Sequence, residues 1–264
     1  MKEKILSHLS TECPWRDTLY WYSQVDSTNT RAKLLAKDGA AEGTVMIAGN
    51  QTAGRGRMGR SFQSPDGQGV YLSVILRPKC APTELMHLTC AAGAAMVEAV
   101  EAVSGIRPQV KWINDLVVGN RKLGGILTEM SVSNGLVDYA VVGIGINCLQ
   151  TKSDFPDEIA GMATSLSLVA GKTVLPQQLA AAMVDALYKM NATLFTEKSR
   201  WMTQYKENCI TLGKDIQVIR QDSVRPGKAL DIDDDGGLLV AYPDGSTQVV
   251  ASGEVSVRGM YGYV

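Results

Sequence analysis

Arginine and glycine alternate in one short segment of this chain, residues 54–60, with the sequence GRGRMGR. Glycine lets backbone N–H groups approach an anion closely, and a guanidinium offers a planar fork of donors that matches a carboxylate or a phosphate. The segment therefore predicts a loop that binds such a group. A solvated basic loop, or a weak contact with RNA, is the alternative that this pattern alone leaves open.

A second candidate for anion binding is Lys122, which precedes two glycines and an apolar stretch. At partial burial an opposite charge contributes about 4 kcal/mol, several times the value of an exposed ion pair. A lysine in this position is therefore expected to face a buried anion. Asn114 and Asp115 interrupt two predicted strands with polar side chains, and they fit either a binding site or a simple β-turn.

Two further glycine patterns have more than one reading. Gly143 and Gly145 alternate in the sequence GIGIN, which removes side chains from one strand face where a ligand or another backbone comes close, or else marks a tight bend. Residues 54–59 also satisfy the G-x-G-x-x-G pattern of dinucleotide-binding folds. However, the following residues 60–69 contain Pro65 and further glycines and cannot form the helix which that fold requires.

Hydrophobic spacing predicts the elements that position these residues. Alternating or continuous apolar residues predict strands over residues 18–25, 44–50, 70–76, 109–112, 116–118, 122–130 and 136–146. Helical spacing predicts helices over residues 29–37, with Ser27 as the N-cap, 85–103, 179–194 and 198–208. The pairs Gly119-Asn120 and Asn134-Gly135 are expected hairpin turns. This order predicts the α+β class, with a mixed, mostly antiparallel sheet and packed helices.

The texture of the chain changes after Gly213. Short strands are expected there, separated by Pro226-Gly227, Gly236-Gly237 and Asp244-Gly245, at the spacing of a small β-barrel. We place a domain boundary near Thr211. The chain is therefore expected to have a main α+β domain over residues 1–210 and a small β-barrel over residues 211–264.

The composition limits the classes of protein. A net charge of -1, from 26 basic and 27 acidic residues, argues against binding nucleic acid by bulk electrostatics. The five cysteines have wide spacings and no C-x-x-C, so free thiols are expected rather than a zinc site. No run approaches the ~18 apolar residues that a membrane helix needs. We therefore expect a soluble, cytoplasmic protein that does not associate with a membrane.

Four motifs in order carry a resemblance to a known family. They are GRGRMGR at 54–60, KWINDL at 111–116, RKLGGIL at 121–127 and GIGIN at 143–147, and they resemble the motifs of biotin protein ligases, also called biotin-[acetyl-CoA-carboxylase] ligases. The resemblance runs from about Tyr20 to the C terminus. It implies a catalytic domain like that of class II synthetases and an SH3-like C-terminal barrel. The chain departs from the family at Ile113, where proline is usual, and at Phe62, where tryptophan is usual.

The resemblance implies an activity and a set of site residues. Biotin would react with ATP to give biotinyl-5'-AMP, and the biotinyl group would pass to a specific lysine of a biotin carboxyl carrier domain. Lys122 and Arg57 are the implied catalytic residues. The implied biotin-binding residues are Ser27, Thr28, Asn29, Gln51, Arg55, Gly56, Arg57, Lys122 and Gly124. The implied ATP-binding residues are Arg57, Asn114, Asp115, Lys122 and Asn147.

The resemblance also implies cofactors and partners. Mg²⁺ is expected on the phosphates of ATP, and the protein partner is the biotin carboxyl carrier protein of a biotin-dependent carboxylase. A homodimer is possible, since the family contains monomers and dimers. Some members bind DNA through an N-terminal winged helix, but only about twenty residues precede the first predicted strand, so we expect no DNA binding.

Two competing functions remain open from the sequence. A lipoate or octanoate ligase or transferase has a related fold and activates its substrate in the same way. A non-catalytic module that binds RNA or a partner through the arginine loop belongs to a different class. We also expect residues 55–69 to be open or disordered when no ligand is bound, because a mobile cover can shield an acyl-adenylate from water.

Overall fold

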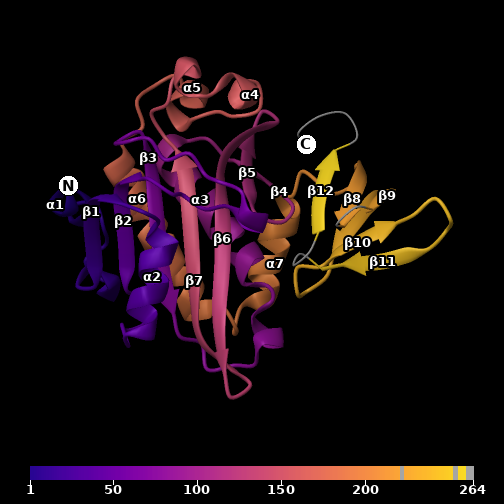
Figure 1. The fold of residues 1–264 in the computed structure, drawn as a ribbon, viewed down its shortest axis with the longest axis horizontal. Helices are drawn as coiled ribbons and strands as arrows, with labels where there is room; N and C mark the ends of the chain where they lie inside the picture. The colour runs from indigo at the N-terminus through magenta and orange to yellow at the C-terminus, as the bar shows by residue number, and fades with distance from the viewer. Residues whose placement is uncertain (221–222, 252–254, 260–264) are drawn as a thin grey trace.

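The computed structural model describes residues 1–220, 223–251 and 255–259 of the 264-residue chain. Its centre is a seven-stranded sheet with the strand order β1-β2-β3-β7-β6-β5-β4 (Figure 1). These strands are β1 (Leu19–Val25), β2 (Val45–Gln51), β3 (Gly69–Leu76), β4 (Gln109–Lys111), β5 (Asp115–Val118), β6 (Arg121–Ser133) and β7 (Leu136–Asn147). β1 and β2 are parallel, and the other neighbouring pairs are antiparallel. The predicted α+β class with a mixed, mostly antiparallel sheet is confirmed.

Helices cover both faces of this sheet. On one face α3 (Leu88–Ser104) packs against α6 (Pro176–Thr193) and α7 (Lys198–Glu207), while α2 (Thr28–Lys37) lies against β2, β3 and β7. Because β3 is buried along its whole length, alternate side chains enter two different cores. Leu72 and Val74 join the core beneath α3 and α6, whereas Ile75 packs with the alanines of α2. The α2 face is the one that holds the site described below.

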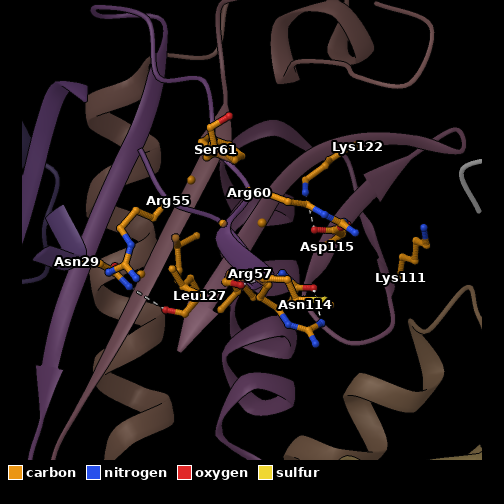
Figure 2. Close-up of a pocket in the computed structure, with 18 of the residues that line it drawn as sticks. Asn29, Arg55, Arg57, Arg60, Ser61, Lys111, Asn114, Asp115, Lys122 and Leu127 are labelled. Carbon is orange, nitrogen blue, oxygen red and sulfur yellow. Dashed lines mark hydrogen bonds and ion pairs between the residues drawn. The ribbon is translucent and has the colours of Figure 1, made fainter. Parts of the chain in front are cut away.

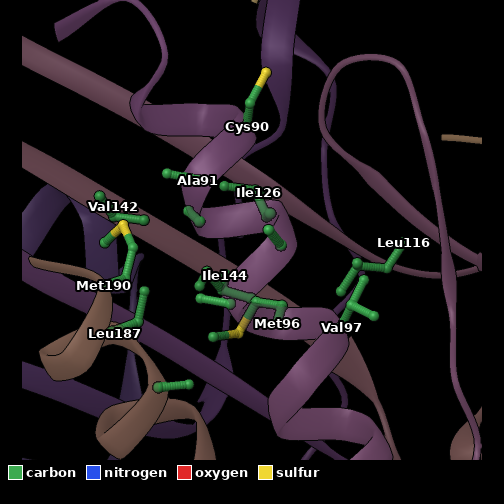
Figure 3. Close-up of a cluster of buried hydrophobic side chains, with 14 of the residues drawn as sticks. Cys90, Ala91, Met96, Val97, Leu116, Ile126, Val142, Ile144, Leu187 and Met190 are labelled. Atoms are coloured by element: carbon green, nitrogen blue, oxygen red, sulfur yellow. The ribbon is translucent and has the colours of Figure 1, made fainter. Parts of the chain in front are cut away.

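The larger core lies between the large sheet and the helices α3 and α6. Figure 3 shows Leu187 and Met190 of α6 beside Val142 of β7, with Met96 of α3 nearby. All four are fully buried, and each side chain of this size contributes roughly 1.5–3 kcal/mol when it is transferred from water. This core supports the sheet from the face that carries α3 and α6, and the cavity lies on the opposite face, beside α2.

The helical segment Pro82–Ser104 corrects the prediction that no part of the chain is apolar enough to span a membrane. Pro82–Ser104 is long and apolar enough by composition to cross a membrane, with a mean hydropathy of 1.2. Alanines supply much of its apolar character, and Glu98 and Glu101 interrupt it, so no long apolar run is visible in the sequence. However, 67% of its apolar window is buried inside the protein, which is typical of the core helix of a globular domain, so the segment is weak evidence for a membrane span.

The remaining elements are short. They are α1 (Lys2–Leu6), α4 (Asp157–Ala160), α5 (Leu166–Ala170) and the 3-10 turns η1 (Pro14–Arg16), η2 (Arg57–Gly59), η3 (Pro82–Leu85) and η4 (Lys152–Asp154). Both hairpin turns predicted in the large sheet are confirmed, because Asn120 and Asn134 have positive φ between the paired strands. Asparagine tolerates this left-handed conformation better than other non-glycine residues.

A second, five-stranded antiparallel sheet lies next to β4 and α7, with the order β11-β10-β9-β8-β12 (Figure 1). Its strands are β8 (Asp215–Arg220), β9 (Ser223–Ile232), β10 (Leu238–Ala241), β11 (Thr247–Val250) and β12 (Val255–Gly259). The turns predicted at Gly236 and Gly245 are confirmed by their positive φ. The proposed domain boundary near Thr211 lies between α7 and β8.

The turn predicted at Pro226-Gly227 is wrong, because both residues lie inside β9. Pro226 stands opposite Gln217 of β8, while the pairing of β10 with β9 reaches only to Lys228. At Pro226, β9 therefore has a neighbouring strand on one side only. If the backbone nitrogen of Pro226 faces away from β8, its lack of an N–H removes no hydrogen bond from the sheet. Gly227 packs closely, since a Cβ there would lie 2.6 Å from Val240 Cγ1.

Trp112 joins the two sheets through both of its N–H groups. Its backbone N–H donates to Thr211 Oγ1 at 2.9 Å, and its indole Nε1 donates to the carbonyl of Gly236 at 2.9 Å. Trp112→Phe keeps most of the ring but leaves the Gly236 carbonyl without this donor. We expect a loss of about 1–3 kcal/mol in the free energy of unfolding, measured by urea denaturation. An unchanged urea midpoint would show that this hydrogen bond does not stabilise the junction.

Candidate active site

A cavity of about 640 Å³ lies on the α2 face of the large sheet, within the size range of small-molecule sites. Residues 54–62, which we call the flap, form one of its walls. Of the residues predicted from the sequence, ten line the cavity: Ser27, Thr28, Asn29, Gln51, Arg55, Gly56, Arg57, Asn114, Asp115 and Lys122. Figure 2 shows Asn29 and Arg55 toward one end, Asp115 and Lys122 toward the other, and Leu127 in between.

A hydrogen-bonded network fixes the polar side chains at the first end. Gln51 Oε1 accepts from Thr28 N at 2.9 Å and from Thr28 Oγ1 at 3.1 Å, while Gln51 Nε2 donates to Ser64 Oγ at 2.8 Å. The Ser73 hydroxyl lies 2.6 Å from Asn29 Oδ1 and 2.8 Å from Thr28 Oγ1. Because each group has a partner within the network, the side chains of Thr28, Asn29 and Gln51 keep fixed positions at the cavity wall.

Ser73 is a member of this network that the sequence analysis missed. Its signal is a small hydroxyl in the middle of β3, a strand whose residues are all buried. A buried hydroxyl needs a hydrogen-bond partner, so its position in an apolar run indicated a polar group across the sheet.

Ser27 occupies the predicted N-cap position of α2, but the expected capping hydrogen bond from its side chain is absent. Ser27 precedes α2 with extended backbone angles, φ -156° and ψ 134°, but its side chain accepts no capping hydrogen bond. The N–H of Thr28 at the start of α2 donates instead to Gln51 at the end of β2. The Ser27 side chain is 2% exposed and lines the cavity.

Two glycines of β7 make room for side chains that cross the sheet. A Cβ at Gly143 would lie 1.7 Å from Asn29 Oδ1, and a Cβ at Gly145 would lie 2.5 Å from the ring of Phe62. β7 runs unbroken through both positions, so the tight bend considered as an alternative does not exist. Close approach of other groups is the reason for both glycines.

The flap is folded as a narrow loop over the cavity. Gly56 N donates to the carbonyl of Arg60 at 2.7 Å, and Phe62 N donates to the carbonyl of Gly54 at 2.9 Å. A Cβ at Gly54 would lie 2.3 Å from that part of the chain, at the Phe62 carbonyl oxygen, so the closeness of the two flap arms requires glycine. The Phe62 ring packs edge-on against Tyr71 of β3, with ring centroids 6.4 Å apart.

The second end of the cavity is rich in cations. Lys122 Nζ lies 2.6 Å from Asp115 Oδ1, and Arg57 Nη1 donates to Asn114 Oδ1 at 3.2 Å (Figure 2). Burial lowers the pKa of the Arg57 guanidinium from its usual value, although the nearby Asp115 carboxylate opposes this shift. A bound anion would offset the unfavourable burial of this charge. Arg60 also lines the cavity.

Backbone contacts hold the cationic residues in place. Asn114 Nδ2 donates to the carbonyl of Ile126 in β6 at 2.9 Å, so Asn114 bridges the strand and Arg57 and is more than a turn residue. The backbone of Lys122 is fixed by Met162, whose carbonyl accepts from Lys122 N at 2.7 Å, and by Thr164, whose N donates to the Lys122 carbonyl at 2.8 Å.

Two predicted site residues do not line the cavity. A Cβ at Gly124 would lie 2.4 Å from the carbonyl oxygen of Gly145, so this glycine allows β6 and β7 to pack closely. Asn147 donates to the carbonyl of Thr164 at 3.0 Å and accepts from Gln150 at 3.2 Å. The binding roles assigned to Gly124 and Asn147 stay predictions.

Distant segments complete the cavity wall. Ile159, Met162 and Ala163 come from the region of α4 and the segment after it, and Val257 comes from β12 of the second sheet. No local pattern predicts these four residues, because the fold brings them to the cavity from distant parts of the chain. Among the residues that the structure describes, no three or more His, Cys, Asp or Glu side chains gather as a metal site.

Comparisons with known proteins agree with this geometry. The model of the biotin/lipoate A/B protein ligase family matches residues 21–147, and that of the biotin protein ligase C-terminal domain matches residues 211–258. The bifunctional ligase/repressor BirA of Bacillus subtilis is 34% identical over 92% of this chain and 75% of its own length. The biotin-[acetyl-CoA-carboxylase] ligase of Mycobacterium tuberculosis is 32% identical over 91% of this chain and 89% of its own length.

A solved structure extends the agreement to three dimensions. The biotin protein ligase of Aquifex aeolicus, in complex with biotin and ATP, superposes with a TM-score of 0.77 at 29% identity and covers 91% of this chain and 98% of its own. This similarity includes both sheets, since it spans nearly the whole of each chain. The chain therefore belongs to the biotin protein ligase family.

Proposed function

We propose that this protein activates biotin with ATP as biotinyl-5'-AMP and then transfers the biotinyl group to a lysine of a biotin carboxyl carrier protein. The observation that carries the proposal is one cavity with two chemically different ends. A fixed polar network around Thr28 and Asn29 suits the ureido group of biotin, whose donors and acceptors need partners when buried. The cations at the other end suit its carboxylate and the phosphates of ATP.

In the first step a carboxylate oxygen of biotin attacks the α-phosphorus of ATP. A C–O–P bond forms, the bond from the α-phosphorus to the bridging oxygen breaks, and pyrophosphate leaves. Negative charge crowds at the α-phosphate as this happens. Lys122 and Arg57 are positioned to stabilise that charge, and cations held in advance contribute more than mobile ones because they need no reorganisation.

In the second step the amine of the carrier lysine attacks the carbonyl carbon of the mixed anhydride. An amide forms, AMP leaves with the electron pair of the C–O bond, and the amine loses a proton. The nucleophile comes from the partner, so this chain needs to hold the adenylate and keep water away from it. The flap over the cavity is suited to both tasks.

Mg²⁺ is expected to accompany ATP. This ion usually binds through one or two carboxylates together with substrate phosphates, and Asp115 supplies a carboxylate at the cationic end of the cavity. Bound there, Mg²⁺ would neutralise phosphate charge. Asp115 Oδ1 also lies 2.6 Å from Lys122 Nζ, so it orients the ammonium group whether or not Mg²⁺ is bound.

Substrate choice is tested by the exchange of labelled pyrophosphate into ATP, with biotin, lipoate and octanoate in parallel. We expect exchange with biotin only, because an acyl chain without a ureido ring offers no donors or acceptors to the polar side chains of Thr28 and Asn29. Exchange with lipoate alone would reassign the substrate. No exchange with any acid, together with salt-sensitive binding of RNA, would favour a non-catalytic module.

Ligand should protect the flap from proteolysis. Arg55, Arg57 and Arg60 are trypsin sites in the flap, and we expect biotin with ATP to slow cleavage there by about tenfold. Limited trypsin digestion followed by mass spectrometry measures the effect at each arginine. Cleavage in the flap that biotin and ATP do not suppress would contradict the role of the flap as a cover.

A further inference from the structure

Glu129 of β6 joins three separate elements at the end of the cavity that holds Asn29. Its carboxylate lies 2.7 Å from Lys33 Nζ of α2 and 3.2 Å from Arg55 Nη1 of the flap, and it accepts a hydrogen bond from Asn29 Nδ2 at 3.0 Å. These donors are separated from Glu129 by at least 74 residues in sequence. One carboxylate therefore fixes the flap, α2 and β6 relative to one another.

Glu129 lies next to the cavity but is not one of the residues that line it. Gly125 and Leu127 line the cavity, and Glu129 follows them at the same two-residue spacing on β6, so it lies on the same face of the sheet just beyond the wall. The Glu129 side chain is 22% exposed, against 44% for Arg55. It thus supports residues that contact the ligand site but does not itself face that site.

The carboxylate is kept ionised by its partners. Burial alone would raise the pKa of Glu129, but hydrogen bonds from Lys33 and Asn29 and the charges of Lys33 and Arg55 outweigh it, so the pKa lies below its usual value. A permanent negative charge at this point attracts Arg55 whenever the flap is folded over the cavity.

We propose that Glu129 is a positioning residue that latches the flap through Arg55 and, through the same carboxylate, orients the amide of Asn29 for the ureido end of biotin. Asn29 Nδ2 is held by Glu129 and by the carbonyl of Leu127 at 3.2 Å, and Asn29 Oδ1 accepts from Ser73 with one lone pair, which leaves its second lone pair for an N–H of the ureido group. Closure of the flap and the direction of this amide thus share one anchor. The orientation of the amide toward biotin rests on the proposed function, whereas the latch does not.

Lys33 supplies a matched control. It pairs with the same carboxylate from α2, but it neither belongs to the flap nor lines the cavity. Lys33→Gln removes one cation from Glu129 and leaves Arg55 and Asn29 in contact with it. Glu129→Gln is nearly isosteric, keeps an oxygen that can accept from Asn29, and removes the charge that attracts Arg55.

The latch is tested on the chain without any ligand, by the rate of trypsin cleavage after Arg57 and Arg60 in the flap. We expect Glu129→Gln to raise this rate by about fivefold, as befits a partly exposed ion pair, and Lys33→Gln to change it less than twofold. Urea denaturation checks that each variant is folded. Equal cleavage rates in the wild type and Glu129→Gln would overturn the latch, and they would do so even if the chain activated no biotin.

The second half of the inference is tested by steady-state exchange and by the retention of biotinyl-5'-AMP on the protein. Glu129→Gln should raise the KM for biotin and the release rate of the adenylate by about fivefold each, with kcat within twofold, because the residue positions a binding group and not the reacting atoms. Arg55→Gln combined with Glu129→Gln should release adenylate no faster than the faster single variant. Additive effects of the two substitutions, or an unchanged KM for biotin, would overturn the proposed link between Arg55 and Asn29 through Glu129. A wild type that makes no adenylate would refute the proposed function, and the trypsin experiment would still test the latch.

Discussion

Lys122→Ala is expected to lower the rate of biotinyl-5'-AMP formation by about 10²–10³-fold, the effect of removing one prearranged donor from a charged transition state. The ammonium is fixed at 2.6 Å from Asp115 and its backbone is held by Met162 and Thr164, so this cation is positioned before the reaction begins. Biotin binding should change far less, because the ureido network lies at the other end of the cavity. Single-turnover adenylate formation, measured beside biotin affinity, separates the two effects.

Controls distinguish the loss of the ammonium from secondary effects. Lys122→Ala leaves Asp115 without this cation, although Arg57 remains nearby, and the double variant Lys122→Ala with Asp115→Asn removes the carboxylate as well; it should remain as slow as the single variant. Lys189→Ala replaces an exposed lysine of α6 on the other face of the sheet and should keep full activity. A fully active Lys122→Ala would remove Lys122 from the catalytic account.

Gly143→Ala is expected to weaken biotin binding by about a hundredfold. The added Cβ would lie 1.7 Å from Asn29 Oδ1, a separation that forces Asn29 away from Ser73 and Glu129. Overpacking of this kind costs roughly 1–3 kcal/mol, and here it falls on a residue of the ureido network. Isothermal titration calorimetry with biotin measures the loss.

Gly161→Ala is the matched control for this substitution. A Cβ at Gly161 meets no atom within 4 Å, and its backbone is right-handed with φ -77°, so alanine should fit without strain. Thermal denaturation of both variants shows whether the fold is retained. If Gly143→Ala binds biotin as well as Gly161→Ala does, the tight packing of β7 against Asn29 has no part in binding.

The helices and strands are largely predictable from the sequence, because the patterns that indicate them are local. The spacing of Leu179, Met183 and Leu187 predicts α6, and the alternation around Asn134-Gly135 predicts the β6-β7 hairpin. The error at Pro226 has a physical origin: proline usually ends a strand, but it is tolerated where a neighbouring strand is missing on one side. That information lies in the pairing of β10, which no local pattern contains.

The site residues were predictable only in part, for the same reason. Motif residues such as Arg57 and Lys122 combine unusual types with glycine neighbours, and ten of those predicted do line the cavity. Glu129 gave no signal, because a carboxylate within a strand is common, and only the fold brings Lys33 and Arg55 beside this one. Met162 and Val257 were missed because segments far apart in the chain bring them to the cavity.

We expect this cavity to align the biotin carboxylate with the α-phosphate of ATP beside Lys122. A crystal structure of the protein with biotin and a non-hydrolysable ATP analogue would show this alignment. We expect the ureido ring at Thr28 and Asn29, the carboxylate and α-phosphate within hydrogen-bonding distance of Lys122 Nζ, and the Arg57 guanidinium on the phosphates. Either ligand bound elsewhere, or both bound in the cavity with Lys122 and Arg57 turned away from them, would contradict the account.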